Sequence, residues 1–161
     1  MVYTPGENMK YEAKHIANFF VKKGMDSGNP VTPMKLQKLV YIAHGWHLGL
    51  TGEPLFKDEV GAWPFGPVIR SVYKEFISFS KSPITELAVD FWGNVCEVAE
   101  TDEHIMALLE KIWEVYGKYS ATQLSNMTHE RGTPWDTVYE EGKSKIIPNQ
   151  VIEDYYKEMA G

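Results

Sequence analysis

The segment from Thr32 to Gly52, TPMKLQKLVYIAHGWHLGLTG, limits the possible folds of this chain more than any other. Thr32 is a preferred helix N-cap residue, Pro33 suits the first helical position, and Gly52 suits the exit. Apolar residues between them recur at three- and four-residue spacing, which predicts a helix with one continuous apolar stripe. The stripe consists of Leu36, Leu39, Val40, Ala43, Trp46 and Leu50.

Two glycines lie on the opposite side of this predicted helix. Gly45 and Gly49 are four residues apart and therefore share a face. Each glycine lowers helix stability by roughly 1 kcal/mol relative to alanine, but it also lets another backbone approach closely. We therefore expect this helix to be packed on both sides, as the central helix of its domain.

Periodicity and capping residues predict further helices on both sides of this segment. They cover residues 10–23 with Gly24 as the stop, 67–79, 102–116 with Thr101 as the cap, 121–131 after a Ser120/Gln123 capping box, 134–141 after Thr133, and a last helix from Pro148. Residues 53–61 favour a short strand or an extended segment, and residues 80–100 favour a small hairpin around a turn at 91–94. The expected fold class is mainly α: one compact helical domain, residues 1–161, of about six or seven helices with a small antiparallel β element.

Charge and composition argue against several classes of protein. The net charge is −6, and an acidic chain without a basic stripe is a poor candidate for nucleic acid, whose binding depends on neutralising phosphates. The negative balance fits a partner with a basic surface, and it also fits plain solubility. The single cysteine, Cys96, excludes an internal disulfide, and its apolar surroundings predict an inert buried thiol. With no signal-peptide pattern and no apolar run of about 18 residues, we expect a cytoplasmic protein that does not cross a membrane.

His44 and His47 are the first candidates for chemistry. At positions i and i+3 of a helix they are about 60° apart, which is close enough to share a metal ion. His47 falls near the middle of the apolar stripe and His44 at its edge, so both also suit hydrogen-bonded core positions. No HExxH pattern accompanies them. A core role is favoured for this pair, and metal binding is the alternative.

The segment THERGTPW, residues 128–135, is the second candidate. His129 and Glu130 are potential acid–base groups if a partner lies within reach. The same segment also suits a structural corner, in which Thr133 caps a short helix and Trp135 enters the core. The corner is favoured. Because the chain contains no GxSxG elbow and no glycine-rich phosphate loop, we expect no catalytic residue.

The segment GAWPFGPVIR, residues 61–70, combines rigid and permissive backbone with large rings. Pro64 biases Trp63 toward an extended conformation, which would end a strand. Gly66 can act as a helix N-cap or adopt a positive φ, and Pro67 presets a first helical residue. The segment therefore predicts a strand-to-helix corner.

Phe65 and Arg70 of this corner are the candidates for partner contact. Trp63 and Phe65 flank a nearly rigid proline, so one ring, which we expect to be that of Trp63, can anchor in the core while the other stays available. Interface energy concentrates on a few aromatic and arginine anchors. We therefore expect Phe65 and Arg70 to contribute to binding.

Several motifs follow one another in a fixed order between Lys35 and Trp135. They are Lys35, Leu36, Gln37, Lys38 and Leu39; Gly45, Trp46 and His47; Leu55 and Phe56; Ala62, Trp63, Pro64, Phe65, Gly66, Pro67 and Val68; Tyr73; and then Leu124, Thr128, His129, Pro134 and Trp135. In this order they resemble the Panacea domain, the SocA-like antitoxin family.

The resemblance implies a mainly helical antitoxin of a bacterial or prophage toxin–antitoxin pair, which neutralises a cognate protein toxin by direct contact. It implies no cofactor and no catalytic residue. One relative resembles an adaptor that delivers its toxin to a cellular protease. A proteolysis adaptor or prophage accessory protein without its own toxin is therefore the alternative. A metal-dependent hydrolase that uses His44, His47 and His129 with Glu130 is a third hypothesis.

Overall fold

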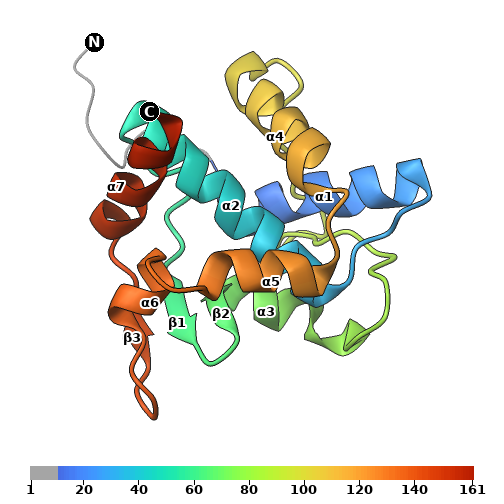
Figure 1. The fold of residues 1–161 in the computed structure, drawn as a ribbon. Helices are drawn as coiled ribbons and strands as arrows, with labels where there is room; N and C mark the ends of the chain where they lie inside the picture. Colours follow the sequence, from blue (N-terminus) through green and yellow to red (C-terminus); the bar gives the residue numbers. More distant parts are fainter. Residues whose placement is uncertain (1–10) are drawn as a thin grey trace.

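The computed structural model describes residues 11–161, and its elements surround α2 (Pro33–Thr51), the predicted central helix (Figure 1). The other elements are α1 (Ala13–Ser27), β1 (Val60–Trp63), β2 (Gly66–Ile69), α3 (Arg70–Phe76), the 3-10 turn Ile77–Phe79, α4 (Glu103–Tyr116), α5 (Ala121–His129), α6 (Pro134–Val138), β3 (Lys145–Ile146) and α7 (Asn149–Ala160). The mainly α class with a small antiparallel sheet is confirmed. Within residues 11–161, no helix combines the length and apolar character needed to cross a membrane.

The predicted ends of α2 are confirmed. Thr32 Oγ1 accepts a hydrogen bond from the Lys35 amide, and Gly52 adopts a left-handed φ of 77° at the exit. Helices α1, α4, α5 and α7 and strand β2 pack around α2, so 13 of its 19 residues are buried. The exposed residues lie at its two ends, Met34 at the start and Leu50 and Thr51 at the exit, so the last residue of the predicted stripe is not buried. Leu50 is 62% exposed, because burial stops at the last turn.

Helix α7 packs against the glycine face of α2, as the two glycines predict. This is the most extensive helix pair of the structure. A Cβ atom at Gly45 would overlap the ring of Tyr156, and one at Gly49 would lie 2.8 Å from the Tyr156 backbone carbonyl carbon. The glycines therefore set how closely the last helix approaches the central one.

Several predicted helix ends are wrong. Helix α5 ends at His129 and α6 at Val138, short of the predicted residues 131 and 141. Helix α1 continues past Gly24 to Ser27 and ends at Gly28, whose φ is 75°. Gly24 stays helical and lets the returning chain cross directly over it, since a Cβ there would lie 2.9 Å from the Asn29 carbonyl oxygen. The N-cap of α4 is Asp102 instead of Thr101. The predicted start of the first helix at residue 10 lies outside the described residues.

The segment 61–70 forms a β-hairpin, so the predicted strand-to-helix corner is wrong. Strands β1 and β2 pair in antiparallel fashion, with Trp63 opposite Gly66, and the helix begins only at Arg70. Gly66 does adopt the anticipated positive φ, at 117°. Pro67 lies within β2, where proline is tolerated because the strand order β2-β1-β3 makes β2 an edge.

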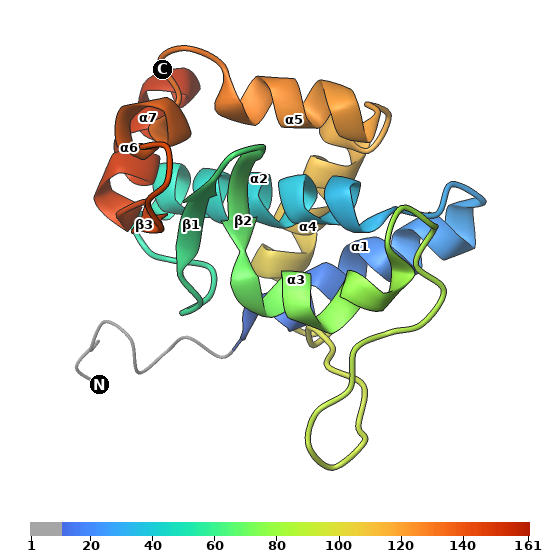
Figure 2. The same ribbon diagram turned by 90° about the horizontal axis from the view of Figure 1, so that it is seen from below.

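Residues 80–100 form a long loop that projects from the body of the molecule (Figure 2). Its turn at Phe91 to Asn94 lies where the sequence predicts it, since the Asp90 amide donates to the Asn94 carbonyl at 2.8 Å. The predicted hairpin is reduced to the single bridge between Val89 and Val95. We call residues 87–98 the aromatic loop, after Phe91 and Trp92 at its tip.

Candidate functional site

The turn of the β1–β2 hairpin is held from inside by α2 and α5. Lys38 Nζ donates to the carbonyl oxygens of Phe65 and Pro67, both at 3.2 Å. Ser125 Oγ donates to the same Phe65 carbonyl at 3.1 Å. Burial lowers the pKa of the Lys38 ammonium to about 8, and within residues 11–161 no carboxylate lies at ion-pair distance from it. Lys38 therefore serves as an internal donor that fixes the turn.

Gly66 is required at this turn for two reasons. Its φ of 117° is rarely adopted by other residues, and a Cβ there would lie 2.8 Å from Lys38 Nζ. The same Cβ would lie 3.5 Å from His129 Cβ. The glycine thus lets a buried lysine and a histidine approach the backbone of the hairpin.

The last motif residues of the resemblance, between Leu124 and Trp135, contact this hairpin, which contains the motif residues 62–68. Trp135 Nε1 donates to the Trp63 carbonyl at 2.6 Å, and the ring centroids of Trp135 and His129 are 5.3 Å apart. His129 Nδ1 is hydrogen-bonded to the Ser125 carbonyl one turn earlier in α5. Thr133 caps α6, as predicted, by accepting from the Asp136 amide. The structure therefore places His129 and Trp135 in a corner against the hairpin.

Lys35 and Gln37, the other polar residues of the KLQK motif, also form hydrogen bonds with backbone groups. Lys35 Nζ donates to the Gly117 carbonyl at the end of α4, at 2.5 Å. Gln37 Nε2 donates to the Ile69 carbonyl at 3.1 Å, and Gln37 Oε1 accepts from the Ile69 amide at 2.9 Å. Both side chains, like that of Lys38, are buried in the first two turns of an otherwise largely apolar helix. The motif KLQK is therefore a scaffold that ties three connections to α2.

His44 and His47 have separate polar partners. His44 is fully buried, donates through Nε2 to Asn149 Oδ1 at 3.0 Å and stacks on Phe56 at 4.2 Å. His47 Nδ1 donates to the Glu53 carbonyl at 2.6 Å. Of the two, His44 is the deeper, contrary to the order that the apolar stripe indicates, because α7 covers it. In residues 11–161, no three His, Cys, Asp or Glu side chains are grouped so as to hold a metal ion.

Acidification is expected to destabilise the fold through His44. Burial lowers the pKa of His44 to about 4, whereas an unfolded histidine titrates near 6.5. Below about pH 6.5 the unfolded chain therefore binds the proton first, and stability falls as the pH falls. Between about pH 7 and pH 5 the wild type should lose about 2 kcal/mol more unfolding free energy than His44→Gln, which keeps a donor but does not titrate. Urea unfolding at both pH values measures this; equal losses would contradict it.

Trp63 does not enter the core, so that expectation is wrong. Its ring packs on Tyr73, with centroids 5.1 Å apart, and it lies over Gly61 on the outer face of the hairpin. Alternate residues of a strand share a face, and the core side of β1 is taken by Val60 and Ala62. The Trp63 side chain is therefore only half-buried.

The two expected contact residues are both accessible. Phe65 is 73% exposed at the hairpin turn, and Arg70 is exposed at the first residue of α3. They lie at opposite ends of β2, so the structure does not bring them into one cluster. Each remains a separate candidate for a contact.

The aromatic loop presents the most exposed aromatic side chains of the described chain. Phe91 is 92% and Trp92 is 81% exposed, and their rings meet edge to face at 5.2 Å. A large aromatic side chain buries about 150–250 Å² when a partner covers it, and clustered exposed apolar side chains mark interaction surfaces. Sequence reasoning identified this turn but missed its exposure; two adjacent aromatics within a turn were the available signal.

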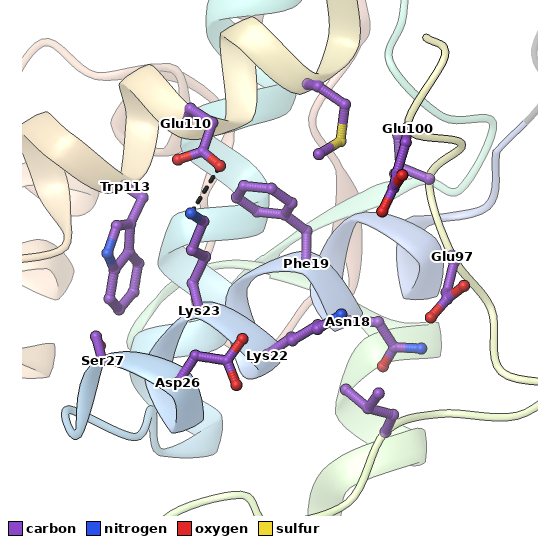
Figure 3. A pocket seen from close by; sticks show the side chains of 13 residues that line it. Asn18, Phe19, Lys22, Lys23, Asp26, Ser27, Glu97, Glu100, Glu110 and Trp113 are labelled. Carbon is purple, nitrogen blue, oxygen red and sulfur yellow. Dashed lines mark ion pairs between the residues drawn. The ribbon is translucent and has the colours of Figure 1, made fainter. Parts of the chain in front are cut away.

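A groove of about 500 Å³ lies beside the base of this loop, between α1 and α4 (Figure 3). Its apolar lining comes from Phe19 of α1, Trp113 and Met106 of α4, and Leu87 and Val98 of the loop.

Charged side chains form much of the remaining lining of the groove. They are Lys22, Lys23, Asp26, Glu97, Glu100 and Glu110. Lys23 and Glu110 form an ion pair of 2.7 Å across the groove. An apolar floor with acidic walls suits an extended or helical protein segment.

Comparison with known proteins agrees with the arrangement of the motifs. The family model described as "Antitoxin SocA-like, Panacea domain" matches residues 36–136. The chain is 32% identical over 131 residues to Antitoxin SocA of Caulobacter vibrioides, a match that covers 79% of this chain and 70% of the relative. No solved structure matches the chain significantly. The matched residues include α2, the hairpin and the Trp135 corner, so this chain belongs to the Panacea-domain family of SocA-like antitoxins.

Proposed function

We propose that this protein is an antitoxin that neutralises a cognate protein toxin by binding to it directly. The observation that carries the proposal is the division between the buried polar residues of the KLQK motif and the exposed aromatic side chains. The motif residues Lys35, Gln37 and Lys38 are buried and bonded to backbone, whereas Phe91 and Trp92 are exposed. A shared buried scaffold with contacts outside it would allow relatives to bind chemically different toxins.

The family resemblance and the relative's name support the antitoxin role. Phe65 and Arg70 remain proposed contacts, since both are exposed and of the residue types that anchor interfaces. His44, His47 and His129 each bond a backbone or amide oxygen. No contact of these histidines therefore favours the hydrolase hypothesis over the antitoxin role.

Co-expression with the protein encoded next to this gene tests the proposal. The neighbour alone should arrest growth, and the pair should restore growth and co-purify as a stable complex. Phe65→Ala and Arg70→Ala should each weaken the complex about tenfold if these residues are anchors, without lowering the unfolding free energy by more than about 0.5 kcal/mol. Absence of both rescue and complex would refute the proposal.

The same cells distinguish occlusion from delivery to a protease. If the antitoxin only covers its toxin, the amount of the toxin should be unchanged or higher when both are expressed. If it acts as an adaptor, the toxin should disappear faster in the presence of the antitoxin. Following the toxin by immunoblot after synthesis is stopped separates these two forms of the proposed function.

A further inference from the structure

We infer that the aromatic loop and the groove beside it form the docking surface for a basic, amphipathic segment of the toxin; this inference rests on the proposed function. Neither the family match nor the resemblance assigns a contact surface. Four observations of the structure support it: the exposed rings, the apolar floor of the groove, the distribution of charge and the rigid attachment of the loop.

The tip of the loop offers two aromatic anchors. Phe91 and Trp92 are the two most exposed large apolar side chains of residues 11–161, and Val89 and Val95 beside them are about half as exposed. All four residues lie at or next to the tip of the loop, whose backbone projects from the body of the molecule in Figure 2. Such residues gain free energy when a partner covers them, and tryptophan is among the residue types most enriched in interface anchors.

The groove continues this apolar surface toward the body of the protein. Leu87 and Val98, on the two sides of the loop base, are part of its lining. Phe19 and Trp113 line it from opposite helices (Figure 3). A cavity of about 500 Å³ falls within the 300–1,000 Å³ that binding clefts typically occupy. A partner segment that covers the tip can therefore place an apolar side chain in the groove.

The charge of this region specifies the chemistry of the partner. Residues 82–110 contain seven of the 22 acidic residues and none of the 16 lysines and arginines. Residues 82–110 therefore carry a formal charge of −7, and all other residues of the chain together are nearly neutral, because the net charge of the chain is −6. Opposite charges across an interface speed association and select the partner.

The charged side chains that line the groove are also mostly negative. Lys23 is paired with Glu110, and across the described residues Asp26, Glu97 and Glu100 have no ion-pair partner. Lys22 is the one remaining cation of the lining. A segment that brings lysines or arginines beside its apolar residues complements these walls, whereas an acidic segment is repelled.

The loop is rigidly attached in spite of its length. Asn18 of α1 donates through Nδ2 to the carbonyls of Ala88 and Cys96, at 2.9 and 2.8 Å, and accepts from the Ala88 amide at 2.8 Å. These bonds join both sides of the loop base to the helix that lines the groove. Because the loop base is held against this helix, less conformational entropy is lost when a partner covers the loop and the groove.

A random peptide library displayed on phage tests the surface without knowledge of the toxin. Peptides selected on the wild-type protein should combine lysine or arginine with aromatic or aliphatic residues. Their affinity should fall at least about tenfold in Phe91→Ala/Trp92→Ala and in Glu97→Lys/Glu100→Lys, and it should weaken with added salt. Leu50→Ala and Glu141→Lys/Glu158→Lys, which change exposed apolar and acidic residues elsewhere on the molecule, should alter it less than about twofold.

Three results of this selection would overturn the inference: no binding peptide, peptides that are acidic or uncharged, or peptides whose binding survives both loop variants.

Two other possible occupants of the docking surface are tested in separate experiments. A wild-type dimer that Phe91→Ala/Trp92→Ala converts to a monomer in sedimentation would assign the loop to a second copy of this chain. Binding of phosphatidylserine vesicles that the same variant abolishes would assign the loop to a membrane. Either result would overturn the inference.

The complex with the neighbour-encoded protein separates this inference from the proposed function. If the wild type does not bind that protein, the proposed function fails whatever the peptides show. If the wild type binds it and the two loop variants bind equally well, only the docking surface is refuted. If the loop variants lose at least about tenfold in affinity while their unfolding free energy is unchanged, both stand.

Discussion

Gly45→Ala is expected to lower the free energy of unfolding by about 2 kcal/mol, although alanine is the better helix former. The new methyl group would overlap the ring of Tyr156, which is 4% exposed and boxed in by the rings of Tyr41 and Trp46. Overpacking typically costs about 1–3 kcal/mol, and because the overlapped ring is enclosed we expect a cost of about 3 kcal/mol here. The gain of about 1 kcal/mol in helix propensity then leaves the net loss of about 2 kcal/mol. Urea unfolding followed by circular dichroism measures the change.

The companion variant Tyr156→Leu provides the control for this prediction. In the Tyr156→Leu background the overlap is gone, so Gly45→Ala should be neutral or should stabilise by up to about 1 kcal/mol. The change of sign between the two backgrounds is the signature of helix packing. If Gly45→Ala stabilises the wild-type background as well, α7 does not pack on the glycine face of α2.

Gln37→Met is expected to lower the free energy of unfolding by about 3 kcal/mol while preserving the volume of the side chain. The Gln37 amide bonds both the N–H and the C=O of Ile69, as a neighbouring strand would, at the outer edge of β2. Ile69 is fully buried, so water cannot replace these bonds. Each buried backbone group left without a partner costs about 1–3 kcal/mol.

Gln150→Met is the matched control. Gln150 is exposed on α7 and bonds only to the exposed carboxylates of Glu153 and Asp154. The same chemical change there should alter the unfolding free energy by less than about 0.5 kcal/mol. Equal effects at positions 37 and 150 would show that the bonds to Ile69 do not support the fold.

The polar residues of the motif show why residue type alone is a poor guide to the binding surface of this protein. Lys35, Gln37 and Lys38 resemble binding residues by type, yet each ends on a backbone carbonyl of a different connection. Buried polar groups need partners, and irregular connections supply unpaired carbonyls. The KLQK residues thus stabilise the scaffold, and we propose that exposed side chains elsewhere recognise the partner.

Local signals in the sequence were sufficient for most helices. Caps at Thr32, Ser120 and Thr133 each accept the expected backbone amide, because a capping bond spans only three residues. The close approach of α7 to Gly45 and Gly49 was also predictable, since a glycine pair on one helix face has few other uses. The family resemblance, carried by ordered motifs, agreed with the match over residues 36–136.

The hairpin at 61–70 required the tertiary structure. Its sequence suits a helix start at Pro67, but pairing with β1 and the bonds from Lys38 and Gln37 keep residues 66–69 extended. Strand β3 joins the sheet from residues 145–146, and no local pattern records such a distant pairing. Long-range contacts therefore override a local preference worth at most about 1 kcal/mol.

The exposure of the aromatic side chains also depends on tertiary contacts. Local sequence patterns are enough to establish most of the helices, the central place of α2 and the acidic character of residues 82–110. They do not reveal that Trp63 lies on the outer face of a hairpin while Phe91 and Trp92 project into solvent. Burial depends on which distant elements cover a side chain, because hydrophobicity alone is the same for a core residue and for an interface anchor.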